Sequence, residues 1–205
     1  MSSSSFPISS SVGMVIDASV VINLNATGSA GEILGAFPNP FSVTDVALGE
    51  LAKGERSGHR DSHHLRQLVD RGIVGLEQLG TAGQATFASL VEGSAIATLD
   101  DGEAATIARA IEVGGIAVID ERKARIICES RYPELAVVST ADLLIDQIVR
   151  DALGHDGQID AIVAALQGAR MRVPPSRIAN VVDIIGNERA LSCNSLPKSV
   201  RTAAS

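Results

Sequence analysis

The chain has 205 residues, of which 45% are hydrophobic, 2% are aromatic and none is tryptophan, and its net charge is −7. This length suffices for one domain whose core is built from Val, Ile, Leu and Ala, while so few aromatic rings argue against nucleic-acid binding by base stacking. The acidic balance argues mildly against a simple phosphate-binding module, although bound divalent cations would offset part of it.

Short apolar runs alternate with helical patterns, which predicts an α/β protein with three layers, α/β/α, around a central, mostly parallel sheet. We expect a disordered Ser-rich leader over residues 1–13, one domain over 14–190 and a disordered tail over 191–205. Strands are predicted at 14–17, 41–44, 73–79, 116–120 and 135–139. Helices are predicted at 18–24, 31–37, 44–54, 61–72, 84–93, 99–115, 121–132, 140–153, 158–168 and 176–185.

The cysteine pattern and the apolar runs bear on the compartment. Cys128 and Cys193 have no framework spacing, which favours reduced thiols in the cytoplasm. The N-terminal stretch lacks the basic and apolar regions of a secretory signal, and no apolar run reaches the length of a membrane span. These observations favour a cytoplasmic protein with no membrane partner.

Two predicted strands end on the same tripeptide, Val-Ile-Asp, which places Asp17 and Asp120 directly after apolar runs. Ligands bind to open parallel sheets at the carboxyl ends of the strands. If the first and fourth strands are neighbours, the two carboxylates converge at that edge.

Two further acids can join them. Glu50 lies on the helix that follows the second strand, and Glu103 opens the helix that leads into the Asp120 strand, among small alanines that allow close approach. At about 5 Å and an effective dielectric constant of about 20, each pair of like charges costs roughly 3 kcal/mol, so protons or cations must neutralise the group. Oxygen ligands of this kind suit Mg²⁺ or Mn²⁺, which support cleavage of phosphodiester bonds.

Each acid also has a purely structural interpretation. Asp17 and Asp120 could cap the helices that follow them, Glu50 could be a solvent-facing helix acid, and Glu103 has capping-box spacing with Asp100. The cations that follow Asp120 could steer a phosphate backbone or form a solvated face; they are Arg122, Lys123 and Arg125.

The ordered set of motifs resembles the PIN-domain family. "MVIDASVVINL" resembles its first strand, "FSVTDVALGEL" its second motif, "LDDGEAATIARA" the third motif of a VapC-like branch with L-x-x-GE-A, and "AVIDERKAR" the DD-x-x-AR stretch of that branch. "ARMRVPPSRIANVVDIIGNE" is similar to the branch's C-terminal ending. The chain departs from the pattern at Val118, where many members have Thr or Ser, and in "STADLLIDQIV", which lacks a glycine-rich stretch.

This resemblance implies a metal-dependent ribonuclease in which Asp17, Glu50, Glu103 and Asp120 are the catalytic, metal-binding acids. Many such proteins are toxins of VapBC-type pairs, often homodimeric and inhibited by a small antitoxin. We therefore expect a Mg²⁺- or Mn²⁺-dependent endoribonuclease acting on RNA, with an antitoxin and a homodimer as candidate partners.

Other classes remain as alternatives. The first is a non-catalytic RNA-binding or regulatory protein that keeps the fold. A haloacid-dehalogenase-like phosphatase is disfavoured because it needs a second acid two positions after the first-strand aspartate, where this chain has Ser19. A receiver domain is disfavoured because it needs an acid pair beside the end of the first strand.

Overall fold

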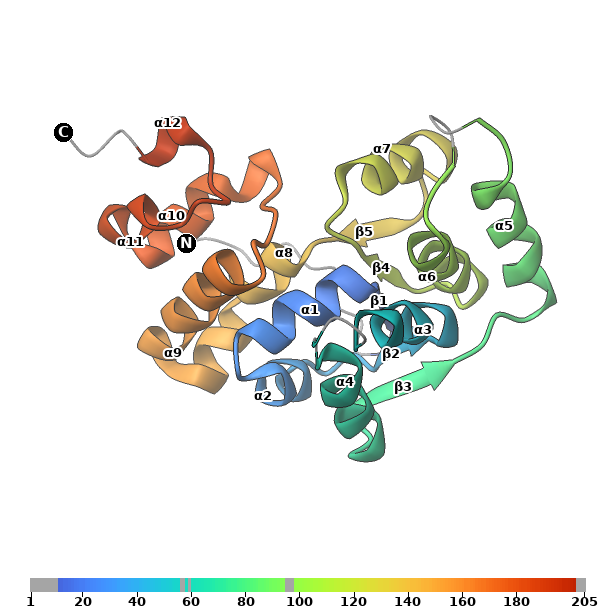
Figure 1. Cartoon of the computed structure of the whole chain (residues 1–205), viewed down its shortest axis with the longest axis horizontal. Helices are drawn as coiled ribbons and strands as arrows, with labels where there is room; N and C mark the ends of the chain where they lie inside the picture. The colour runs from blue at the N-terminus through green and yellow to red at the C-terminus, as the bar shows by residue number, and fades with distance from the viewer. Residues whose placement is uncertain (1–10, 56–57, 59, 95–97, 202–205) are drawn as a thin grey trace. The chain divides into compact units, whose positions relative to one another are not determined.

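The computed structural model describes residues 11–55, 58, 60–94 and 98–201, so most of the expected leader and the last four residues of the expected tail lie outside the described residues. The chain divides into two compact units (Figure 1). Among the described residues, one unit contains 11–21 and those within 38–138, and we call it the sheet unit. The other contains residues 22–37 and 139–201, and we call it the helical unit.

A parallel sheet of five strands forms the centre of the sheet unit. Its order is β3-β2-β1-β4-β5 and every neighbouring pair is parallel. The strands are β1 (Met14–Ile16), β2 (Phe41–Thr44), β3 (Val74–Glu77), β4 (Ile116–Val118) and β5 (Ala136–Val138). The fold class expected from the sequence, α/β/α with a parallel sheet, is confirmed.

The pairing of β1 with β4 is the feature that matters for the site. Met14 pairs with Ile116, and Ile16 pairs with Val118. All six residues of the two strands are buried, as expected for central strands that are covered on both faces. Each strand ends earlier than the sequence predicts, so Asp17 and Asp120 lie in the connections that leave the sheet rather than in the strands.

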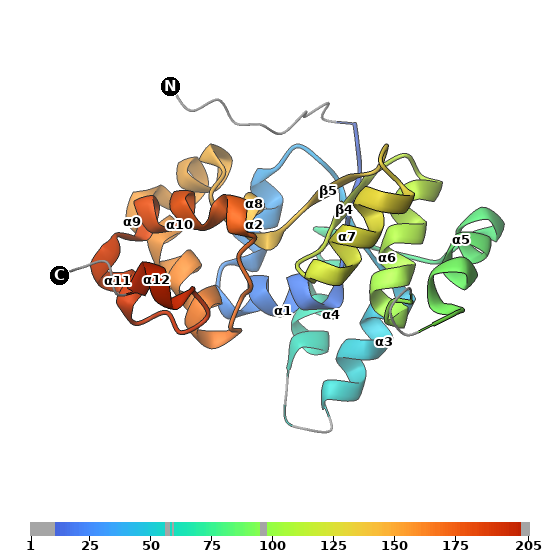
Figure 2. The same ribbon diagram turned by 90° about the horizontal axis from the view of Figure 1, so that it is seen from above.

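In its described residues, the sheet unit contains five complete helices: α3 (Asp45–Gly54), α4 (Asp61–Asp70), α5 (Thr81–Val91), α6 (Asp101–Glu112) and α7 (Arg122–Arg131). The α6 helix packs against β1, β2 and β4 as well as against α3 and α5 (Figure 2). Its buried face is rich in alanine, which allows the close approach to the sheet that the sequence suggests. Because α6 runs into β4 through a short connection, its first turn lies towards the carboxyl ends of the strands.

The boundary between the units falls within α1 (Ala18–Ala26). The helical unit also contains α2 (Ala30–Ala36), α8 (Thr140–Leu144), α9 (Gln147–Gly168), the 3₁₀ turn η2 (Pro175–Arg177), α10 (Ile178–Ile185), α11 (Asn187–Leu191) and α12 (Lys198–Arg201). No helix in the described ranges combines the length and the apolar character that crossing a membrane requires.

The helix predicted at 140–153 is wrong in its bounds, because the structure breaks it at 145–146. The Asp146 side chain accepts a hydrogen bond from the Ile148 N–H at 2.9 Å and so starts α9 there. The helix end predicted at 153 agrees with the structure, because α9 consists of two helical stretches that meet at a kink at Gly154, where the backbone is non-helical (φ +75°, ψ 170°); the second stretch begins directly after the kink rather than at 158. Gln158 stabilises the break, since its Nε2 donates to the carbonyls of Leu144 and Asp146.

The end of the helical unit differs from the sequence expectation. Within the described part of the segment 191–201, the side chains of Cys193 and Leu196 are buried. Ser195 Oγ donates a hydrogen bond to the Leu166 carbonyl at 3.0 Å, which ties this segment to α9. The sequence favours a disordered tail here because few apolar residues are present, but two of those few are buried in the structure.

Candidate functional site

Asp17 lies immediately after β1 and is 4% exposed. Its N–H donates to the Val118 carbonyl at 3.2 Å, and one carboxylate oxygen accepts hydrogen bonds from the Ser19 N–H at 3.1 Å and the Ser19 hydroxyl at 2.7 Å. Burial raises the pKa of Asp17, while the Ser19 hydrogen bonds lower it. The predicted helix-capping role is therefore present, but one cap does not explain why the carboxyl is buried near other acids.

Asp120 follows β4 by two residues and is 7% exposed. The residue before it is held on both sides: the Ile119 N–H donates to Val138 O at 2.8 Å, and the Ile119 carbonyl accepts from Arg125 Nη1 at 3.2 Å. Since β1 and β4 pair in parallel register, Asp17 and Asp120 leave the sheet at the same edge. This is the juxtaposition that the two tripeptides predict.

Glu50 is half-buried on α3 and reaches the first turn of α6. Its Oε1 accepts a hydrogen bond from the Gly102 N–H at 2.9 Å. Burial raises the pKa of Glu50, and the charges of Asp17 and Asp100 raise it further, against the opposing effects of the Gly102 hydrogen bond and Lys53. The interpretation of Glu50 as a solvent-facing acid is therefore wrong.

Glu103 is in the first turn of α6. Burial, followed by the charges of Asp17 and Asp100, raises the pKa of Glu103 to about 7, although a hydrogen bond from the Asp100 N–H lowers it. Half of the predicted capping box is thus formed, since the Asp100 side chain makes no capping hydrogen bond. Glu103 caps its helix and also faces neighbouring carboxylates.

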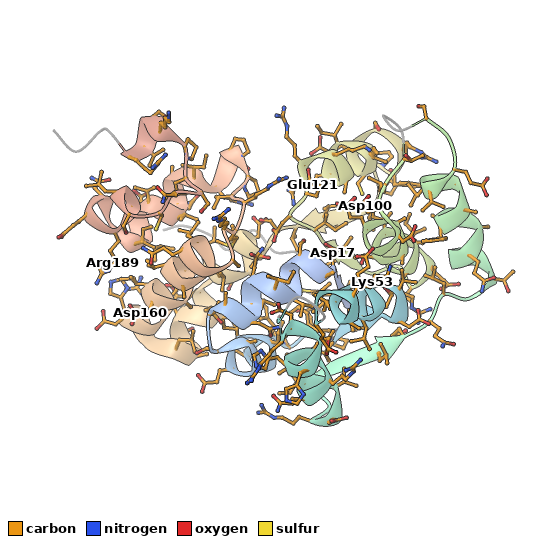
Figure 3. The ribbon with its side chains drawn as sticks, viewed as in Figure 1. Asp17, Lys53, Asp100, Glu121, Asp160 and Arg189 are labelled. Atoms are coloured by element: carbon orange, nitrogen blue, oxygen red, sulfur yellow. The ribbon has the colours of Figure 1, made fainter. Side chains whose placement is uncertain are left out.

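Asp100 is the acid that sequence reasoning missed as a site residue. Its charge raises the pKa values of Asp17, Glu50 and Glu103. Figure 3 shows it near the start of α6, in the same region of the sheet unit as Asp17. Its position in the sequence could have revealed it. Asp100 directly precedes a helix that runs antiparallel to β4, and the start of such a helix lies at the carboxyl edge of the sheet.

The donor chemistry of this acidic cluster fits a hard divalent cation. Its members are carboxylates, and those whose pKa values are raised repel one another in partly desolvated surroundings, which a cation would relieve. Within the described ranges, no group of three or more His, Cys, Asp or Glu side chains is arranged to hold a metal ion as it stands. The fit is therefore one of donor type and placement, not of a preformed coordination shell.

The cations that follow Asp120 have different roles. Lys123 Nζ donates to the Thr98 carbonyl, in the segment that leads into α6, and Arg125 donates to the Ile119 carbonyl. Both therefore fix the backbone of segments that carry acids. Arg122, the first residue of α7, is exposed.

Val118, the position where the chain departs from the family pattern, is 0% exposed within β4. An apolar side chain suits that interior environment. A hydroxyl here would have needed a buried hydrogen-bond partner.

Comparison with known proteins places this geometry in a family. A family model described as a PIN domain matches residues 13–187. No curated protein and no solved structure gave a match. PIN domains are generally nucleases that use divalent metals, which agrees with an acidic cluster at the carboxyl edge of the sheet. From the motifs, the parallel sheet and this match, we conclude that the chain belongs to the PIN-domain family and has its nuclease-type fold.

Proposed function

We propose that this protein is a divalent-metal-dependent endoribonuclease. The observation that carries the proposal is the gathering of Asp17, Glu50 and Glu103 near the first turn of α6, each with a raised pKa, at the edge of the sheet that Asp120 also reaches. Buried carboxylates with raised pKa values are typical of functional sites rather than of stabilising ion pairs.

The four acids Asp17, Glu50, Glu103 and Asp120 would together hold Mg²⁺ or Mn²⁺. When bound, such a cation neutralises the acids, polarises a phosphoryl oxygen and favours deprotonation of an attacking water. Ser19 fixes the orientation of the Asp17 carboxylate through its two hydrogen bonds. Arg125 and Lys123 hold the backbone on either side of the cluster, which keeps the acids at their separations.

RNA is the proposed substrate. The net charge of −7 means that affinity for a polyanion must come from local cations and from the metal. Arg122 is exposed at the start of α7, two residues after Asp120, and we assign it to contact with the RNA backbone.

The finer assignment is the toxin of a VapBC-type pair, cytoplasmic and homodimeric, with a small antitoxin as inhibitor. Its support is the motif set and the two cysteines, both free and buried, which suit a reducing compartment. Light scattering of the purified chain tests the dimer. Co-expression with the product of a short neighbouring gene, scored by loss of RNA cleavage, tests the antitoxin.

The decisive experiment compares Asp17→Asn and Asp120→Asn with the wild type in cleavage of structured RNA with Mn²⁺. Each variant should lose most of its cleavage, because removal of one charge weakens metal binding while the shape of the side chain is kept. Asp160→Asn is the matched control, since Asp160 is an exposed acid of the helical unit. Unchanged cleavage in both site variants would rule out Asp17 and Asp120 as catalytic, metal-binding acids.

A non-catalytic RNA-binding or regulatory protein is the second candidate. Two observations favour it: no described group of three ligands is arranged for a metal, and Val118 replaces a hydroxyl. Tight RNA binding without metal-dependent turnover would support this candidate over the nuclease.

A further inference from the structure

Gly102 is the second residue of α6, and its side of the helix is buried. It is not among the described glycines with positive φ, so its backbone conformation is one that any residue adopts. The backbone conformation therefore does not require glycine at position 102. The space around Gly102 offers a different reason for the absence of a side chain there.

That space is filled by the carboxylate of Glu50. A Cβ atom added at Gly102 would lie 2.8 Å from Glu50 Cδ and 3.2 Å from Oε1, and closer still to Oε2. The Gly102 N–H donates to Oε1 at 2.9 Å. The same residue thus provides the hydrogen bond that holds the carboxylate and the open space in which the carboxylate lies.

We propose that Gly102 is a positioning residue for Glu50. Because Gly102 has no side chain, the Glu50 carboxylate can lie on the first turn of α6. There it is close enough to Asp17 and Asp100 for their charges to act on it. The inference rests on the proposed function, because it treats Glu50 as a metal-binding acid. It goes further by assigning a role to the glycine that precedes Glu103.

Any side chain at position 102 must displace the Glu50 carboxylate from the space that it occupies beside the first turn of α6. The N–H bond would be lost or lengthened, and Glu50 would move away from the acids with which it is proposed to share a cation. The effect should therefore reach metal binding, although Gly102 itself has no group that binds a metal.

The test uses three glycine-to-alanine variants of the full chain. Gly102→Ala fills the space in which the Glu50 carboxylate lies. Gly49→Ala changes the residue next to Glu50 on α3, where an added Cβ meets nothing within 4 Å. Gly83→Ala places a Cβ 2.9 Å from Glu112 Oε2 and 3.2 Å from Leu79 Cδ2, which is a milder clash that involves a carboxylate outside the cluster.

Mn²⁺ affinity, measured from the loss of the free-ion signal in electron paramagnetic resonance, is the main readout. Thermal unfolding without metal is the second. Gly102→Ala should weaken Mn²⁺ binding by about tenfold or more, the typical effect of disturbing a residue that orients a ligand. Gly49→Ala should match the wild type in Mn²⁺ affinity and unfold at a slightly higher temperature, because alanine favours an exposed helix position over glycine. Gly83→Ala should unfold at lower temperature with unchanged Mn²⁺ affinity.

A rescue variant separates positioning from general damage. In Gly102→Ala/Glu50→Asp, the carboxylate is one methylene shorter and withdraws from the new Cβ, so Mn²⁺ binding should recover relative to Gly102→Ala alone. If Gly102→Ala does not fold, the double variant carries the test: it must fold and bind Mn²⁺ more tightly than Glu50→Gln, and its failure overturns the proposal.

The possible failures are distinguishable. Wild-type affinity in Gly102→Ala, with wild-type protein that binds Mn²⁺, overturns the positioning role and leaves the nuclease proposal standing. Absence of Mn²⁺ binding in the wild type overturns the proposed function and the inference with it.

Discussion

Two glutamates of the sheet unit perform the same local task in opposite surroundings. Glu50 accepts one N–H from the first turn of α6. Glu112 accepts the N–H groups of Gly80 and Gly83 at the start of α5, at 3.1 and 3.0 Å. In both places an added Cβ on the glycine would collide with the carboxylate. Each is therefore a carboxylate from one helix that caps another helix across a glycine.

Their charge environments differ. The hydrogen bond from Gly83 and then that from Arg109 lower the pKa of Glu112, and Arg109 also pairs with Glu77. Burial and the neighbouring acids raise the pKa of Glu50, and the cation that opposes them is the exposed Lys53. The capping carboxylate of Glu112 lies beside the partly buried cation Arg109 and stabilises the fold. The capping carboxylate of Glu50 lies among other acids and favours an external cation. The contrast thus separates a structural acid from a candidate functional one.

The largest effect should come from neutralising each glutamate in turn. Glu50→Gln should reduce Mn²⁺-dependent RNA cleavage by about a hundredfold, whereas Glu112→Gln should leave the cleavage rate of folded protein unchanged. Initial rates at saturating Mn²⁺ give the measurement. Equal losses in the two variants would contradict the distinction between them.

Thermal unfolding with Mn²⁺ should show the next largest effect. At a Mn²⁺ concentration of about 100 times Kd, binding adds about 2.7 kcal/mol to the stability of the wild type, which corresponds to a rise in Tm of about 5–10 °C for a chain of this size. Glu112→Gln should start from a lower Tm and show the same rise. Glu50→Gln should show little rise, and a full rise in that variant would remove Glu50 from the metal site.

The stability of the metal-free protein should depend on pH through Glu103. Its pKa is raised from 4.5 to about 7, so the native state binds this proton more tightly than the unfolded state does. The contribution of Glu103 to stability is therefore fully present below pH 4.5, and it is lost as pH rises through about 7. Glu103→Gln should flatten this decline in Tm measured with a chelator present. Glu112, whose pKa is lowered, should act in the opposite direction, losing its stabilisation as pH falls.

The smallest effect should come from Lys53. Because it is exposed, its charge is screened, so Lys53→Gln should tighten Mn²⁺ binding by no more than about fivefold. Arg109→Gln should instead lower Tm by several degrees without changing Mn²⁺ affinity, since Arg109 joins Glu77 and Glu112. Calorimetric titration and thermal scans of both variants make this comparison. A larger change in affinity from Arg109→Gln than from Lys53→Gln would contradict it.

Much of the sheet unit follows from the sequence because its signals are local. Apolar runs interrupted by helical patterns indicate parallel strands, and the two Val-Ile-Asp tripeptides indicate which strand ends meet. The condition on which their convergence depends, that the first and fourth strands are neighbours, is met in the structure. Strand bounds are less accurate, because an apolar residue such as Ile119 can continue the pattern after the regular pairing has ended.

The features that sequence reasoning missed depend on contacts between distant positions. Asp100 looks like a helix cap until the folded chain brings its charge near Glu50. Gly102 looks like a weak helix residue until the Glu50 carboxylate occupies its missing side chain. The break at Asp146 depends on the buried amide of Gln158, which no periodic pattern reveals.

The contact between Glu50 and Gly102 also has a consequence for how related chains can diverge. The two positions are 52 residues apart and share one small volume. A chain that gains a methyl group at position 102 must shorten or lose the acid at position 50, so substitutions at the two positions should be correlated. A correlation between the two positions would therefore report their contact from sequence alone. A set of diverged PIN-domain chains could be sorted by whether they keep both residues or neither.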